Sequence, residues 1–277
     1  MKTAWENLLN LLPKRISAEI KEYAWENLQE LRLRSGSEVE LNYADKRVLL
    51  SVPVTKEDIS YILNVASRYS PWQTETIAQG YITTRGGHRI GICGEAVVHG
   101  SVVQGIRNPD ALCIRLARDV ENIASVFRGL QKSILVLGPP CSGKTTLLRD
   151  IARTLAAEAT VAVVDEREEL FPEGFRRGKR MDVLRLCPKA AGIDMLLRTM
   201  GPDWICMDEI TREADSRAIL QAANCGVRLM ASAHAFDLTD LKKRIIYREL
   251  LENSVFKNVV VLQKNKRFFW EMREIWE

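Results

Sequence analysis

A glycine-rich segment that ends in lysine and threonine stands directly after an apolar run, at residues 134–137. Glycines let the backbone wrap so that its N–H groups point at phosphate oxygens, and a helix N-terminus behind them adds positive potential. In this pattern Lys144 reaches the β- and γ-phosphates of a nucleotide and the Thr145 hydroxyl binds Mg²⁺. The segment therefore predicts a site for ATP and Mg²⁺, in which the nucleotide contacts Gly138, Pro139, Pro140, Cys141, Ser142, Gly143, Lys144, Thr145 and Thr146.

Two adjacent carboxylates follow the apolar run at residues 204–207. A second element of a phosphate site belongs at such a strand end. We expect Asp208 to hold the magnesium shell through water. Glu209, one residue further, is placed to polarise an attacking water.

Another apolar run, residues 161–164, ends in a carboxylate-rich stretch, residues 165–169. We expect Asp165 or Glu169 to share the water or the magnesium ion, the alternative being a solvated loop. A fourth run ends in small residues around His234, where an imidazole could sense the γ-phosphate. A hydrogen-bonded structural histidine is the other interpretation at that position.

Several arginines precede the phosphate loop, and one of them could reach phosphate oxygens across a domain or subunit boundary. Arg115 is the candidate we select, and a solvated arginine is the alternative for each member of the set Arg85, Arg89, Arg107, Arg115 and Arg118.

The helices and strands that position these residues are predicted to form two domains of different class. Residues 1–110 predict a small α+β domain, with amphipathic helices at 4–12 and 17–31, strands at 38–41 and 47–52, and a helix from the capping box of Thr55 and Asp58. Strands around a Gly-Gly turn follow at 81–92.

Residues 111–277 predict an α/β domain. Short apolar runs alternate with helical segments, which is typical of a mainly parallel sheet covered on both faces. The last segment, from residue 258 to 272, predicts a terminal β-hairpin.

Composition narrows the remaining function classes. The 277 residues carry a formal net charge of +4, and acidic and basic residues are interspersed. No basic tail therefore indicates that the chain binds a nucleic acid. The six cysteines have no metal-type spacing and predict reduced thiols in a cytoplasmic protein. Neither an export signal nor a membrane-spanning run is expected.

Four motifs in order resemble the core of the secretion ATPases: the phosphate loop as Walker A, residues 164–169 as the Asp box, residues 201–209 as Walker B, and residues 231–235 as the His box. The segments 80–91 and 114–118 are similar to the N-terminal portion of the stage III sporulation protein AA family. The resemblance covers most of the chain.

This resemblance implies a RecA-like P-loop ATPase, hexameric, at the mother-cell face of a channel between mother cell and forespore, with integral-membrane channel proteins as partners. It assigns phosphate and magnesium binding to Lys144 and Thr145, the Walker B pair to Asp208 and Glu209, and further functional positions to Asp165, Glu169 and His234. The chain departs from the pattern at two positions. Cys141 stands where glycine or a polar residue is commoner, and Asp165 stands where glutamate is typical, which leaves open which carboxylate activates water.

Two other functions compete with a motor. A nucleic-acid-stimulated ATPase would use the same core, but the chain has no basic stripe with interleaved aromatic residues. A nucleotide-gated scaffold would bind ATP with little turnover and respond by changing its assembly state.

Overall fold

The computed structural model describes residues 2–25, 27–43, 45–67, 80–84, 86–140, 142–263 and 273–274. The chain forms two compact units. The first comprises residues 1–119 with 172–175, and the second comprises residues 120–171 with 176–277. The boundary expected at residue 110 lies inside a long strand, β6 (Val102–Arg115), and the first unit continues past the end of that strand.

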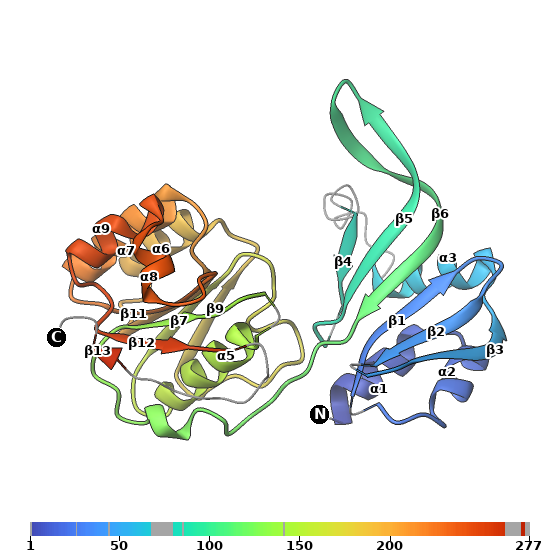
Figure 1. Cartoon of the computed structure of the whole chain (residues 1–277), viewed down its shortest axis with the longest axis horizontal. Coiled ribbons are helices and arrows are strands. Elements are labelled where there is room, and N and C mark those ends of the chain that lie inside the picture. Colours follow the sequence, from blue (N-terminus) through green and yellow to red (C-terminus); the bar gives the residue numbers. More distant parts are fainter. Residues whose placement is uncertain are drawn as a thin grey trace. The chain divides into compact units, whose positions relative to one another are not determined.

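The first unit contains an antiparallel six-stranded sheet in the order β3-β2-β1-β6-β5-β4 (Figure 1). Its other strands are β1 (Leu28–Arg34), β2 (Glu38–Tyr43), β3 (Arg47–Pro53), β4 (Tyr81–Thr83) and β5 (Arg89–His99). The helices α1 (Lys2–Leu11), α2 (Lys14–Ile20) and α3 (Lys56–Ala66) contribute apolar side chains to the core of this sheet. The predicted capping box of α3 is confirmed, with Asp58 N donating to Thr55 Oγ1 and Thr55 N to Asp58 Oδ2.

The helix predicted over residues 17–31 is wrong in its second half. α2 ends at Ile20, and residues from Leu28 onward form β1. Leu31 and Leu33 are fully buried on one face of this strand, an alternation that fits a strand period of two rather than a helical one. Pairing with β2 and β6 then satisfies the backbone groups of β1.

The second unit is built on a seven-stranded sheet in the order β13-β12-β7-β11-β10-β8-β9. The strands are β7 (Ile134–Leu137), β8 (Val161–Asp165), β9 (Met181–Arg185), β10 (Trp204–Glu209), β11 (Arg228–Ala233), β12 (Asn258–Val261) and β13 (Arg273–Glu274). Every pairing is parallel except that of β12 with β13, which confirms the predicted α/β class. The second strand of the expected hairpin, at 268–272, lies outside the described residues.

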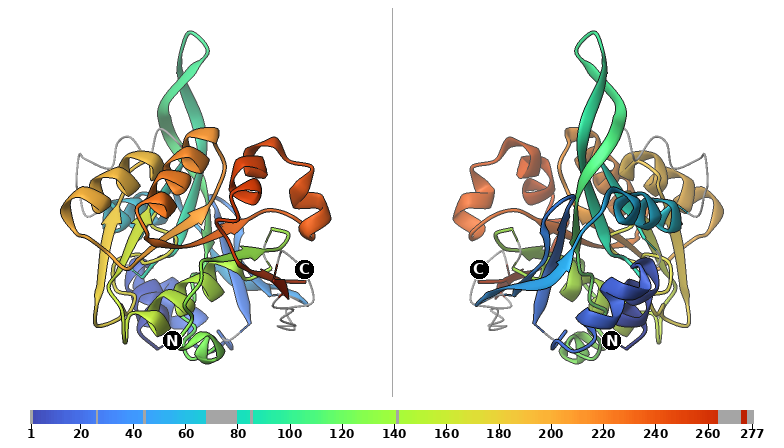
Figure 2. Two further views of the ribbon diagram at one scale, coloured as in Figure 1. Left: turned by 90° about the vertical axis from the view of Figure 1, so that its left-hand side faces the viewer. Right: turned by 90° about the vertical axis from the view of Figure 1, so that its right-hand side faces the viewer.

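Helices cover both faces of this sheet (Figures 1 and 2). On one face α5 (Lys144–Leu155) packs over Ile134 and Val136, and on the other the helices α6 (Lys189–Thr199), α7 (Glu213–Asn224) and α9 (Arg248–Glu252) pack over Leu135 and Leu137. Burying each such side chain contributes roughly 1.5–3 kcal/mol. Because β7, β8, β10 and β11 run parallel, their carboxyl ends meet at one edge of the sheet. The remaining short elements of this unit are η2 (Ser125–Phe127), α8 (Leu238–Lys242) and η3 (Ile245–Tyr247).

Within the described ranges, no helix combines the length and the apolar character that crossing a bilayer requires.

Candidate nucleotide site

The phosphate loop connects the end of β7 to the start of α5. Gly143 caps α5 with φ +99°, in the left-handed region that favours glycine. A Cβ on Gly138 would lie 2.5 Å from Ser142 Oγ and 3.0 Å from the carbonyl oxygen of Leu262. The loop therefore wraps as the sequence predicts, while Cys141 lies outside the described residues.

Lys144 is buried and turns its ammonium group back over the loop. Its Nζ donates to the carbonyl oxygens of Gly138 and Pro139, at 2.9 and 3.0 Å. The hydroxyl of Ser142 is buried and has no hydrogen-bond partner in the described part of the chain. An ammonium group, an unsatisfied hydroxyl and a helix N-terminus form a donor set that suits phosphate oxygens. These residues fit the nucleotide that the motif predicts.

His234 connects the lysine to a carboxylate on the neighbouring strand. Its Nδ1 lies 2.9 Å from Lys144 Nζ, and its Nε2 lies 2.8 Å from Glu209 Oε2. An ammonium group has only donors, so Nδ1 accepts from Lys144 and the ring proton sits on Nε2, which donates to Glu209. The structure thus brings three of the predicted residues into one hydrogen-bonded chain.

Asp208 and Thr145 are the predicted magnesium residues, and both are half-buried. Asp208 Oδ1 accepts from the hydroxyl of Ser232, which is fully buried on β11, at 3.1 Å. No cluster of three or more potential ligands that could hold a metal occurs among the residues described. A hydroxyl and a carboxylate are oxygen ligands that suit Mg²⁺, which takes one or two protein oxygens and fills its other positions with water and phosphate.

Asp165, at the end of β8, holds the loop that follows this strand by accepting backbone hydrogen bonds from it. Its carboxylate accepts from the backbone N–H groups of Glu169 (2.8 Å), Leu170 (3.2 Å) and Phe171 (2.7 Å). Burial raises the pKa of Asp165, and the three backbone donors oppose that rise. These contacts show that Asp165 holds the loop, and its share in binding the water or the magnesium stays a prediction.

The chain matches the family described as Sporulation stage III, protein AA, over residues 2–276. It belongs to this family. A curated relative, "Stage III sporulation protein AA" of Bacillus subtilis (strain 168), is 36% identical over 271 residues, which cover 91% of this chain and 88% of the relative.

Two solved structures of other proteins share the α/β fold of this member of the sporulation family. The pilus retraction motor PilT with bound ADP superposes with a TM-score of 0.62 at 15% identity, and the ATPase DotB of Legionella pneumophila with 0.59 at 14%. Each comparison covers 90% of this chain and 76% of the other. At such identity the likeness concerns the fold alone.

In this family member, Glu169 does lie beside the Walker B pair. A small cavity of about 30 Å³ is lined by Glu166, Glu169, Asp208, Glu209 and Lys189, among others. Glu166 forms an ion pair with Lys189, whose side chain is buried. Lys189 and Arg167 are the two cations of this lining, and they partly offset its five carboxylates.

Sequence reasoning missed Lys189 and also Arg149. Arg149 is buried on α5, five residues after Lys144, and donates to the carbonyl oxygens of Glu169 (2.8 Å) and Leu170. α5 and Asp165 therefore hold the same loop from two sides. The sequence carries no clear signal for Arg149, because it shares the polar face of an amphipathic helix with Thr146, Asp150 and Arg153.

The selected arginine, Arg115, lies in the first unit and forms an ion pair with Glu30 at 3.3 Å. Two other candidates also have partners in that unit. The guanidinium of Arg89 lies 3.9 Å from the centre of the Tyr81 ring, and Arg118 donates to the Leu28 carbonyl at 2.8 Å. Arg85 lies outside the described residues.

Proposed function

We propose that this chain is a Mg²⁺-dependent ATP hydrolase that energises or assembles a transport channel between mother cell and forespore during endospore formation. The observation that carries the proposal is the hydrogen-bonded chain from Lys144 through His234 to Glu209. It joins the predicted phosphate-binding lysine to the predicted general base at the carboxyl edge of a parallel sheet, where such folds bind nucleotides. The name of the Bacillus subtilis relative and the ADP in the PilT structure support it.

Lys144 would exchange the loop carbonyls for phosphate oxygens when ATP binds, since a charge-assisted bond to phosphate is stronger than one to a neutral carbonyl. The Ser142 hydroxyl would gain the partner that it lacks. Thr145 and Asp208 would hold Mg²⁺, which neutralises charge developing on the phosphates. Glu209 would accept the proton of the attacking water, and His234 would orient Glu209 by donating from Nε2.

The proposed setting is peripheral, on the mother-cell side of a membrane. The assembly would be a homo-hexamer that works with integral-membrane channel proteins, and no nucleic acid is expected as a partner. Arg115, from the first unit, is the proposed residue that acts in trans on the phosphates.

Steady-state hydrolysis of Mg-ATP over a series of protein concentrations tests this function, with Lys144→Ala as the blank and single-stranded DNA as an additive. We expect turnover that rises more steeply than protein concentration, ignores DNA and disappears in the blank. Activity that requires DNA would favour a nucleic-acid-stimulated ATPase. ATP-dependent oligomerisation with negligible turnover would favour a nucleotide-gated scaffold.

A further inference from the structure

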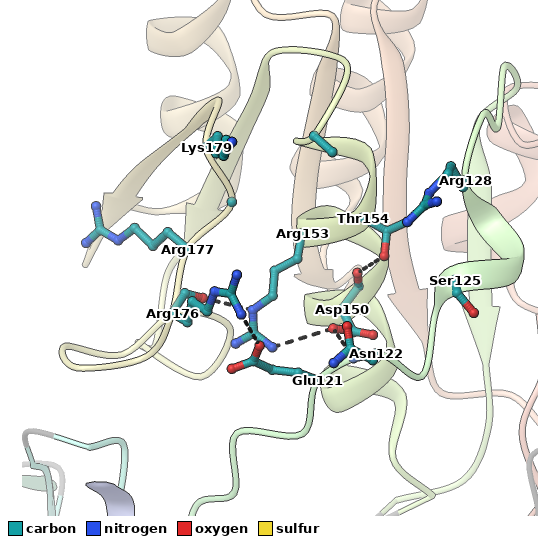
Figure 3. Close-up of a pocket in the computed structure, with 12 residues that line it drawn as sticks. Glu121, Asn122, Ser125, Arg128, Asp150, Arg153, Thr154, Arg176, Arg177 and Lys179 are labelled. Carbon is teal, nitrogen blue, oxygen red and sulfur yellow. Dashed lines mark hydrogen bonds and ion pairs between the residues drawn. The ribbon is translucent and has the colours of Figure 1, made fainter.

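A second cationic site lies in the second unit, beside the later turns of α5. The loop before β9 carries the run Arg176-Arg177-Gly178-Lys179-Arg180, which the nucleotide site does not use. This loop and α5 line a hollow of about 340 Å³ (Figure 3). Thr154, on its wall, is ten residues past Lys144, which is about 15 Å along the helix axis.

The hollow concentrates positive charge. Its lining holds five cationic side chains, Arg128, Arg153, Arg176, Arg177 and Lys179, against the two carboxylates of Glu121 and Asp150. The local net charge is therefore +3, compared with +4 for the whole chain. Ala157 contributes the only apolar side chain among the described lining residues.

The floor of the hollow is held by internal hydrogen bonds. Asp150 accepts from the backbone N–H groups of Ile123 (2.7 Å) and Ala124 (2.9 Å), and Arg153 donates to the carbonyl oxygens of Val120 (3.1 Å) and Arg176 (2.8 Å). A Cβ on Gly178 would lie 2.4 Å from Ala156 Cβ, so the basic loop sits tightly against α5. The arrangement is thus preformed.

The rim of the hollow is formed by Arg128, Arg176, Arg177 and Lys179. It differs from the floor because most of these cations form no ion pair with a carboxylate among the described residues. Arg176 pairs with Glu121 at 2.7 Å. Arg128, Arg177 and Lys179 are exposed, and none has an ion-pair partner within the part of the chain that the structure describes. Figure 3 shows Arg128 on one side of Asp150 and Thr154, and the basic loop on the other. Partial burial and repulsion from Arg185 lower the pKa of the Arg177 guanidinium.

We propose that this hollow is a second anion site, separate from the phosphate loop, which binds closely spaced phosphate groups. Guanidinium forks match the geometry of phosphate oxygens. A peptide partner would require apolar anchors, which this lining does not provide. The phosphate groups could belong to one free polyphosphate or to neighbouring phosphate headgroups on a lipid surface, since both present phosphate oxygens close together. The site does not depend on the proposed hydrolytic function.

Calorimetric titration with sodium tripolyphosphate tests the proposal on the full-length chain. We expect two classes of site in the wild type, and loss of one class in Lys144→Ala. Arg128→Ala/Lys179→Ala should weaken the other class by about tenfold or more, because charged hydrogen bonds are lost. A charge-matched control, Arg248→Ala/Lys242→Ala, removes exposed cations elsewhere in the unit and should change neither class. Persistence of one class in Lys144→Ala separates this site from the nucleotide site.

Flotation with phosphatidylcholine vesicles, with and without phosphatidic acid, distinguishes the source of the phosphate. Binding of tripolyphosphate without flotation indicates a free ligand. Flotation that needs phosphatidic acid and is lost in Arg128→Ala/Lys179→Ala indicates a headgroup. Absence of both, or binding that the double variant retains in full with wild-type thermal unfolding, overturns the proposal.

Discussion

The Nε2 atom of His234 lies 2.8 Å from Oε2 of Glu209, which ties the histidine directly after β11 to the carboxylate that ends β10. The same ring receives a hydrogen bond from Lys144 at Nδ1. One imidazole therefore contacts both the phosphate-binding lysine and the proposed base. In the proposed mechanism Lys144 turns to phosphate and Nδ1 loses its donor while the Nε2 contact persists, so nucleotide binding would change the partners of the residue proposed to orient the base.

Glu209→Gln should retain ATP binding and lose turnover. Glutamine preserves the size of the side chain but cannot accept a proton, and loss of a general base lowers kcat by about 10²–10⁴-fold. Nucleotide binding and single-turnover hydrolysis measured on the same preparation check this. Glu213→Gln, an exposed carboxylate at the start of α7, is the control. Near-normal turnover in Glu209→Gln would reassign the base to the Asp165 and Glu169 region.

His234→Ala should lower kcat without weakening nucleotide binding. In the structure, Lys144 contacts both the carbonyl oxygens of its own loop and His234. Removing His234 therefore removes a contact to the lysine and none to ATP. The bond to Glu209 orients the base, and loss of an orienting partner costs about 10–100-fold in other sites. Separate determination of kcat and the dissociation constant for ATP checks the split. An equal loss in both quantities would place His234 in direct contact with nucleotide.

Much of the site was predictable because local patterns determine it. The glycines, Lys144 and the strand-end carboxylate Glu209 are read directly from sequence. Their convergence with His234 follows from a parallel sheet, in which successive carboxyl ends share one edge. The order of the strands brings β10 and β11 together, and this adjacency creates the contact between Glu209 and His234.

The errors arose where distant pairing decides the structure. Residues 28–31 continue a helical apolar pattern, but Glu30 pairs with Arg115 on β6, far along the chain. The backbone contacts of Asp165 could not be predicted from the sequence, for a related reason. Its carboxylate oxygens accept backbone hydrogen bonds because the chain turns back after β8, with Glu168 at φ +53°. No local residue pattern predicts this turn.

Gly138→Ala should impair both nucleotide binding and stability. The added Cβ would lie 2.5 Å from Ser142 Oγ. It could not move away from Ser142 freely, because the carbonyl oxygen of Leu262 lies only 3.0 Å from it. Such overpacking costs about 1–3 kcal/mol. Gly105→Ala is the matched control, since no atom lies within 4 Å of its added Cβ. Thermal unfolding and binding of a fluorescent ATP analogue report the two effects, and wild-type values for Gly138→Ala would contradict the close approach.

Glu40 should make the first unit sensitive to acid. Its buried carboxylate accepts from Arg34 at 2.6 Å and pairs with Arg47 at 3.0 Å, and these contacts hold the pKa of Glu40 below its ordinary value of 4.5. The unfolded chain binds the proton more readily, so the stabilisation is present above pH 4.5 and is lost as the pH falls through the lower, folded pKa. The difference in melting temperature between wild type and Glu40→Gln should therefore shrink on acidification. Glu38→Gln, exposed on the same strand, should show no such trend.

Asp165→Asn should loosen the loop after β8 while leaving the sheet folded. Asparagine keeps one oxygen, so it cannot accept from all three N–H groups of Glu169, Leu170 and Phe171, and at least one buried donor loses its partner. That loss costs about 1–3 kcal/mol, and the relief of a buried charge places the net effect toward the lower end. Hydrogen exchange at these three amides should accelerate by about tenfold or more, since 1.4 kcal/mol corresponds to a factor of ten. Asp182→Asn on β9 should leave the same amides unchanged. Equal protection in wild type and Asp165→Asn would show that Arg149 alone suffices to hold the loop.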